Sequence, residues 1–101
     1  MYAQVTNISI PATKIGEVRE LITNKYFSSL KKRDGFVVAY FHEAIDDPTV
    51  IQIITYWKNQ SMIEDARKTG SLQETIQMLT SHIPETRIKR QGYLVTITTD
   101  D

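Results

Sequence analysis

The chain has 101 residues, of which 41% are hydrophobic and 24% are charged, so we predict one globular domain over residues 1–101 rather than a disordered chain. Its 12 Lys and Arg balance its 12 Asp and Glu, and this lack of a basic excess predicts no nucleic-acid partner. The chain contains no cysteine, which excludes disulfides, thiolate metal sites and a cysteine nucleophile.

The first half of the chain alternates between strand and helix patterns. Residues 3–10 are rich in β-branched side chains, which predicts a strand that Pro11 ends. Over residues 12–32 apolar side chains recur every three or four positions, which predicts an amphipathic helix. Residues 36–44 and 49–57 predict two further strands, and the short turn between them indicates an antiparallel hairpin.

The second half predicts a helix in two pieces and a last strand. Asn59 or Ser61 can cap the start of the helix, Gly70 interrupts it, and its second piece ends at Pro84. Residues 86–99 predict the last strand, with Gly92 as a site for a bulge or a bend. The order β-α-β-β-α-β predicts the ferredoxin-like α+β fold, in which two helices cover one face of a four-stranded antiparallel sheet.

The two middle strands carry apolar side chains on both faces. Alternate residues of a strand face opposite sides, and one face of the second strand is expected to carry Phe36, Val38, Tyr40 and His42. A sheet with one solvated face would alternate cleanly between apolar and polar residues. Because one helical layer covers only one face, we predict that a second copy of the chain covers the other, in a homodimer that closes as a dimeric α+β barrel.

Two stretches of the sequence suggest a family. In "RDGFVVAYFHE" a Gly-Phe pair starts the second strand, and in "IITYWKNQSMIEDARKTG" Trp57 ends the third strand before a short polar turn and a broken helix. Together with the order of elements, they resemble the antibiotic-biosynthesis-monooxygenase-like family of dimeric α+β barrels over nearly the whole chain. The resemblance implies an oxidoreductase, a cofactor-independent monooxygenase that acts on a small aromatic or quinone-type compound. It also implies that Trp57 lines a substrate pocket between the helices and the sheet.

The sequence departs from the family pattern at the positions that carry the known chemistry. The best-studied monooxygenases have an Asn four residues before the Trp, where this chain has Ile53. Haem-degrading members have a His on the next helical segment, which this chain lacks, so haem degradation is the less favoured activity. Asn7 matches a first-strand Asn of those enzymes only roughly, because its register relative to Pro11 differs by one residue.

These departures leave open whether the protein is an enzyme. The alternative is a non-catalytic dimer of the same fold that binds a small molecule or has a structural role, and this alternative predicts that Trp57 and Phe41 fill the pocket space. A Gly-rich phosphate loop, a Gly-x-Ser-x-Gly motif and a Ser-His-Asp set at suggestive spacing are absent from the sequence. Catalysis would therefore depend on an enclosed apolar pocket with one or two hydrogen-bonding groups.

Four residues are candidates for a substrate pocket: Trp57, Asn7, Tyr40 and His42. For Trp57 the sequence leaves two interpretations, a core side chain and a pocket wall. Two isolated His and no carboxylate cluster predict no metal site, and we expect no cofactor. In the last strand Arg87 and Lys89 are typical of a charged edge strand, and Arg90 breaks the alternation.

We expect a cytoplasmic protein without a membrane partner. No stretch approaches the roughly 18 apolar residues of a membrane span. The first ten residues, "MYAQVTNISI", lack the basic start and the long apolar run of a signal peptide.

Overall fold

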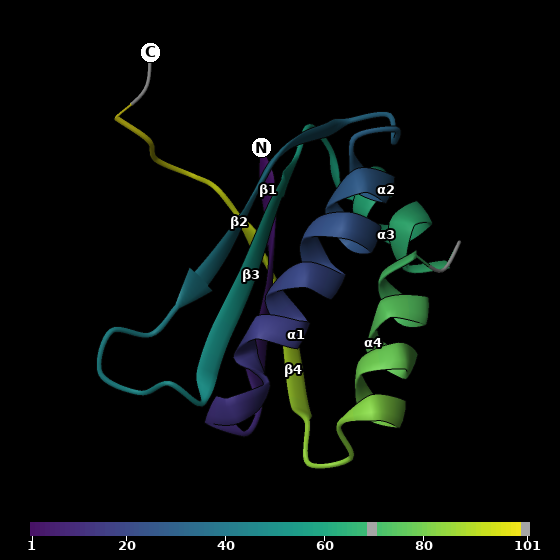
Figure 1. Ribbon diagram of the computed structural model, residues 1–101. Helices are drawn as coiled ribbons and strands as arrows, with labels where there is room; N and C mark the ends of the chain where they lie inside the picture. The colour runs from purple at the N-terminus through teal and green to yellow at the C-terminus, as the bar shows by residue number, and fades with distance from the viewer. Residues whose placement is uncertain (69–70, 100–101) are drawn as a thin grey trace.

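The computed structural model describes residues 1–68 and 71–99, apart from the side chains of residues 66–68 and 71–72. In chain order the elements are β1 (Tyr2–Ser9), the 3-10 turn η1 (Ala12–Lys14), α1 (Ile15–Leu21), the π-helical segment η2 (Ile22–Phe27), α2 (Ser28–Leu30), β2 (Phe36–Glu43), β3 (Val50–Trp57), α3 (Gln60–Lys68), α4 (Ser71–His82) and β4 (Arg87–Leu94). The four strands form one antiparallel sheet in the order β2-β3-β1-β4. The helices lie on one face of this sheet (Figure 1), which confirms the ferredoxin-like α+β fold.

The core lies between the sheet and the helical layer. The stripe predicted for the first helix is buried, as Val18, Ile22 and Leu30 are almost fully excluded from solvent. It packs against the helix-facing side of the sheet, where Ile51 and Ile53 of β3 belong to the same buried cluster. Burial of such side chains stabilises the fold by roughly 1.5–3 kcal/mol each, so this stripe fixes the first helix on the sheet.

The first helical stretch differs from the regular helix that its sequence predicts. Its hydrogen bonding changes to a π-helical pattern between Ile22 and Phe27. At the start of this segment the Thr23 hydroxyl donates a hydrogen bond of 2.8 Å to the carbonyl of Arg19. That carbonyl is the acceptor that the Thr23 N–H uses in an α-helix, so the hydroxyl competes with the backbone at this point. Apolar periodicity does not reveal such a local competition.

The second strand contains a β-bulge that corrects one prediction. Regular alternation predicts Phe36 on the same face as Val38, but the register shifts between these two residues. Phe36 therefore packs on the helix-facing side, with its ring centroid 5.5 Å from that of Trp57. Because a bulge adds one residue to a strand, it reverses the alternation of side chains on either side of it.

The last strand is shorter and more regular than predicted. It pairs with β1 without interruption, and Gly92 lies opposite Gln4 in a continuous register, so the strand has no bulge there. The strand ends at Leu94, and after the Val95 N–H donates to the Met1 carbonyl the chain leaves the sheet (Figure 1). Ile97 on this C-terminal segment is 90% exposed.

Helix α3 begins at a capped turn directly after Trp57. The Asn59 side-chain oxygen accepts a hydrogen bond of 3.1 Å from the N–H of Met62, which satisfies one donor of the first turn. Of the two predicted caps, Asn59 is therefore the one that begins α3, whereas Ser61 lies inside the helix. In the part of the chain that the structure describes, no helix is long and apolar enough to cross a membrane.

The strands present two chemically different faces. On the helix-facing side, Gln4, Thr6 and Ile8 of β1 are buried. On the opposite side, which we call the outer face, lie Val5 and Asn7 of β1 and their register partners on the neighbouring strands. The described residues include no helix on the outer face (Figure 1), and Tyr40 is 49% exposed there.

Candidate functional site

A row of polar side chains lies on the helix-facing side of the sheet. Thr55 of β3 and Gln4 of β1 face each other in register, and both are buried. The indole N–H of Trp57 donates a hydrogen bond of 2.9 Å to the Thr55 hydroxyl. The side-chain nitrogen of Gln4 is buried without a hydrogen-bond partner among the described residues. Buried donors are normally paired, so Gln4 is an unusual residue for a core position.

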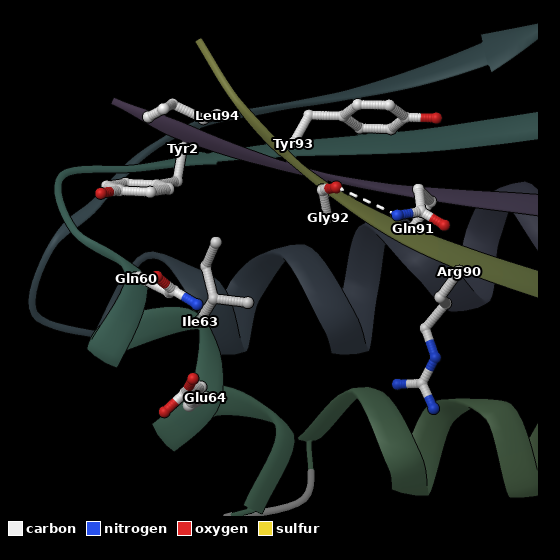
Figure 2. Close-up of a pocket in the computed structure, with 9 residues that line it drawn as sticks. All are labelled: Tyr2, Gln60, Ile63, Glu64, Arg90, Gln91, Gly92, Tyr93 and Leu94. Atoms are coloured by element: carbon white, nitrogen blue, oxygen red, sulfur yellow. Dashed lines mark hydrogen bonds between the residues drawn. The ribbon is translucent and has the colours of Figure 1, made fainter.

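A cavity of about 430 Å³ adjoins this row between β4 and α3. Figure 2 shows its walls: Ile63 points from α3 toward the sheet, near Tyr2 and Leu94. The cavity is lined by Tyr2, Gln60, Ile63, Glu64, Arg90, Gln91, Gly92, Tyr93 and Leu94. Because Gly92 is the register partner of Gln4, the cavity wall is one residue away from the buried polar row.

Two charged side chains line the cavity. Arg90 extends from β4 toward the helices, while Glu64 projects from α3 (Figure 2). Arg90 is half-buried and Glu64 is exposed. The ion pairs of Lys14 with Glu17 and of Arg19 with Glu43 lie elsewhere on the surface. The cavity therefore combines an apolar wall with a guanidinium group.

The hydroxyl of Tyr26 lies within the electrostatic influence of the same guanidinium. Tyr26 belongs to η2, and its side chain is buried in the core between the helices and the sheet. Burial raises the pKa of this phenol well above its ordinary value, and the positive charges of Arg90 and Arg33 oppose the rise. Tyr26 is therefore neutral at physiological pH.

The raised pKa of Tyr26 predicts a loss of stability at alkaline pH. Below the ordinary value of 10.0 the phenol is neutral in both the folded and unfolded states. Above pH 10.0 the Tyr26 phenol ionises in the unfolded chain but stays protonated in the folded chain. The free energy of unfolding should therefore fall as pH rises from 10 toward the folded pKa. Urea unfolding at pH 9 and 11 measures this fall. The free energy of unfolding should depend less steeply on pH in the Tyr26→Phe variant than in the wild-type protein. An equal slope in both proteins would contradict the assignment to Tyr26.

The structure separates the four predicted site residues into two groups. Trp57 lies on the helix-facing side, 1% exposed in the core, and its register partner Tyr2 lines the cavity while Trp57 itself does not. Asn7, Tyr40 and His42 lie on the outer face. There the side-chain N–H of Gln52 donates a hydrogen bond of 2.9 Å to the side-chain oxygen of Asn7. The side-chain oxygen of Gln52 lies 3.2 Å from the Nδ1 atom of His42. The role of all four in substrate binding stays a prediction.

Sequence reasoning missed Arg90, which lines the cavity, and Gln4, which belongs to the buried polar row beside it. The helix-facing position of Gln4 depends on the register between β1 and β3, which no local pattern gives. Arg90 had a visible signal, because it breaks the alternation of a charged edge strand. In β4 it shares the helix-facing side with Ile88, and its register partner is the buried Thr6.

The space next to Trp57 differs from both sequence-based expectations. Trp57 is buried and Phe41 packs against the same core, so these side chains fill the centre of the interface between sheet and helices. A cavity nevertheless remains at its edge, between β4 and α3, and polar and charged residues share its lining with apolar ones. Within residues 1–68 and 71–99 there is no group of three or more His, Cys, Asp or Glu that could hold a metal ion. The absence of a metal and a cofactor stays a prediction.

A second cavity, of about 410 Å³, lies on the outer face. It is lined by Met1, Val37, Val38, Tyr40, Tyr56, Val95, Ile97 and Thr98. Its lining combines strands β2 and β3 with the segment that follows β4, and most of it is apolar. Exposed apolar patches of this kind are typical of surfaces that contact another protein.

Comparisons with solved structures support the same architecture. A candidate antibiotic biosynthesis monooxygenase from Deinococcus radiodurans superposes with a TM-score of 0.85 at 18% identity, covering 100% of this chain and 98% of that one. A candidate antibiotic biosynthesis monooxygenase from Nitrosomonas europaea superposes with a TM-score of 0.79 at 16% identity, covering 96% of this chain and 100% of that one. SnoaB, a cofactor-independent oxygenase from Streptomyces nogalater, gives 0.79 at 11% identity, with 99% and 97% covered. At such identities the likeness shows the fold.

Sequence comparison identifies the family. No curated protein matches the chain. The family model described as antibiotic biosynthesis monooxygenase matches residues 1–78, which include β1, the hairpin of β2 and β3, and Trp57. The chain therefore belongs to the antibiotic biosynthesis monooxygenase family.

Proposed function

We propose that the protein is a cofactor-independent monooxygenase that oxidises a small aromatic or quinone-type compound in the cavity between β4 and α3. The observation that carries the proposal is this cavity, which adjoins the buried polar row of a chain that belongs to the family. SnoaB, which shares the fold, is a cofactor-independent oxygenase, and this supports the reaction class.

In such a reaction the substrate supplies the electrons. A proton leaves an activated CH₂ group or a phenol, and the resulting anion passes an electron to O₂. The two radicals combine at carbon, and the hydroperoxide loses water to leave a carbonyl group. One O₂ is consumed, one oxygen atom enters the substrate and the other leaves as water. The protein has to bind the substrate, stabilise its anion and limit the access of water.

The residues of the cavity match these tasks. Tyr2, Ile63 and Leu94 provide apolar contacts for an aromatic ring. Arg90 provides a positive charge, and Gln4, whose side-chain nitrogen is buried without a hydrogen-bond partner among the described residues, is the register partner of Gly92 on the neighbouring strand. The cavity therefore offers both apolar surface and polar groups, and small-molecule sites use both kinds of contact.

Oxygen consumption tests this proposal. We expect purified protein without added metal or flavin to consume O₂ with at least one hydroxyaromatic or quinol faster than that compound autoxidises. Gly92→Val should reduce the rate, because Gly92 lines the cavity. Gly16→Val is the matched control, because a side chain at Gly16 meets nothing within 4 Å. Equal rates in the two variants would argue against this cavity, and no turnover across the panel would favour the non-catalytic alternative.

The alternative function is a dimeric small-molecule-binding or structural protein of the same fold. The observation that favours it is Trp57, which is buried in the core where the sequence resemblance implies a pocket wall. Binding of an aromatic ligand without oxygen consumption would support this alternative.

We also propose that the outer face pairs with a second copy of the chain. This face carries Tyr40 and Tyr93, which are 49% and 55% exposed, and the apolar cavity beside the C-terminal segment. A central sheet strand with an uncovered apolar face normally has a partner layer. A two-fold dimer would supply that layer from the same surface of the other copy.

A further inference from the structure

We propose that Met62 is an oxidation site, and that conversion of its thioether to the sulfoxide by hydrogen peroxide releases the start of α3 from the turn of residues 31–35 that precedes β2. Met62 is not part of the lining of the cavity between β4 and α3. The oxidation site is therefore separate from that cavity, although both depend on the position of the same helix.

The packing of Met62 on Gly35 is unusually close. Gly35 has a φ of 80°, a backbone conformation that favours glycine. A β-carbon at Gly35 would lie 2.6 Å from Cγ of Met62 and 3.6 Å from its sulfur. The Met62 side chain therefore lies directly on the backbone of Gly35, in space that exists only because residue 35 has no side chain. This leaves no room for an oxygen atom between the sulfur and Gly35.

The other side of Met62 is accessible to an oxidant from water. Met62 is half-buried, and it lines a surface cavity of about 360 Å³ together with Lys32, Arg33, Asp34 and Asp65. Hydrogen peroxide is little larger than water and fits such a cavity. The exposed ammonium group of Lys32 is a donor that can stabilise negative charge on the departing peroxide oxygen. It would also attract the sulfoxide oxygen away from Gly35.

The oxidation step needs only the sulfur and the peroxide. A lone pair of the Met62 sulfur attacks one peroxide oxygen, so that an S–O bond forms while the O–O bond breaks. The proton of the transferred oxygen passes to the departing hydroxide, which leaves as water. Sulfur is oxidised and the peroxide is reduced. Because the sulfoxide is polar and the thioether is apolar, this change disrupts packed contacts.

Met62 lies where a change of packing affects the whole beginning of α3. Its N–H donates to the Asn59 side chain that caps the helix. The Lys58 N–H donates a hydrogen bond of 2.8 Å to the carbonyl of Gly35, so this hydrogen bond and the Met62 contact meet at one residue. Oxidation of Met62 would therefore weaken both attachments of the helix start to the turn before β2.

The consequence extends to the cavity between β4 and α3. Three residues within two positions of Met62 line that cavity from the same helix: Gln60, Ile63 and Glu64 (Figure 2). A shift of α3 after oxidation would move this wall. Peroxide would thereby act on the cavity through a residue that does not line it.

Hydrogen exchange followed by mass spectrometry tests the proposal on the full chain. Hydrogen peroxide is added at neutral pH, and peptide mapping measures the sulfoxide at each Met. We expect the amides of residues 58–65 to exchange at least about tenfold faster in the oxidised protein, because the start of the helix opens more often. The increase in β1 should be smaller, because this strand lies between β3 and β4 and exchanges only when the sheet opens.

Two Met→Leu variants show which methionine is responsible. Met62→Leu keeps the apolar volume but has no sulfur, so peroxide should leave its exchange in residues 58–65 unchanged. Met78→Leu removes the sulfur of a half-buried residue on α4 and should respond to peroxide as the wild-type protein does. Methionine sulfoxide reductases for both epimers should restore slow exchange in the wild-type protein, which keeps the test decisive if Met62→Leu folds poorly.

Three results would each overturn the inference. The first is a Met62 that stays reduced while Met1, which is 51% exposed, is oxidised. The second is a Met62 sulfoxide without faster exchange in residues 58–65. The third is the same acceleration in treated Met62→Leu as in the wild-type protein. None of these results depends on oxygen consumption, so the oxidation site and the proposed function are tested separately.

Discussion

Replacement of Ile54 by Asp is expected to dissociate the proposed dimer into folded monomers. Ile54 lies at the centre of the outer face, with Val5 and Tyr40 as its register partners on the two neighbouring strands. In the single chain it is only half-buried, so a carboxylate there remains hydrated and the fold persists. In a face-to-face dimer the carboxylate would lose that hydration.

The expected effect is large because a two-fold dimer contains the substitution twice. An unpaired polar group that loses water costs about 2 kcal/mol or more in each copy. A total of about 4 kcal/mol raises the dissociation constant of the dimer about a thousandfold. Sedimentation equilibrium at micromolar concentration measures this change directly.

Ile45 provides a matched control for this experiment. It lies in the turn between β2 and β3 and is 99% exposed, so Ile45→Asp makes the same chemical change away from the outer face. It should leave the dimer intact. A wild-type protein that sediments as a monomer, or a dimer that survives Ile54→Asp, would show that the outer face is not the contact between copies.

Trp57→Phe is expected to lower the free energy of unfolding by about 1–3 kcal/mol. The indole is 1% exposed, packs edge-on against Phe36 and donates its N–H to Thr55. Phe leaves part of this volume empty and leaves the buried Thr55 hydroxyl without its donor, and each effect costs stability. Urea unfolding followed by circular dichroism measures the loss.

The same variant distinguishes the two interpretations of Trp57. A core side chain predicts lower stability with oxygen consumption per folded molecule retained. A pocket wall predicts a stability loss below about 0.5 kcal/mol, as for a surface substitution, and a reduced rate. Tyr93→Phe serves as the control for the stability measurement, because Tyr93 is exposed and its hydroxyl should contribute little.

The order and type of the elements follow from local patterns in the sequence. β-Branched side chains predict β1, and the period of apolar residues predicts the first helix. The short turn between two strand patterns predicts the hairpin of β2 and β3, and Asn59 or Ser61 predicts the start of α3. The structure confirms these elements to within a few residues. The bulge after Phe36 was not predictable, because Val37 and Val38 suit a regular strand as well as a bulged one.

The site is less predictable because it depends on relations between elements. The alternation in β1 separates Asn7 from its neighbour Thr6, but only the register with β3 determines which of them shares a side with Trp57. In the structure Thr6 does, and this agrees with the one-residue difference noted for Asn7 in the sequence. Arg90 stood out in its pattern, yet its significance depends on the cavity that α3 forms with β4.

The opposite directions of neighbouring side chains in β1 have a consequence for how this protein can change in evolution. Gln4 and Thr6 lie on the side of the sheet that carries the proposed ligand cavity, whereas Val5 and Asn7 lie on the outer face, the proposed dimer surface. Substitutions on the two faces share few contacts, so their effects on stability should be nearly additive. Under the two proposals, ligand preference could therefore diverge while the dimer is kept. A one-residue insertion in this strand is different, because it would exchange the two sets of side chains and disrupt both properties in a single event.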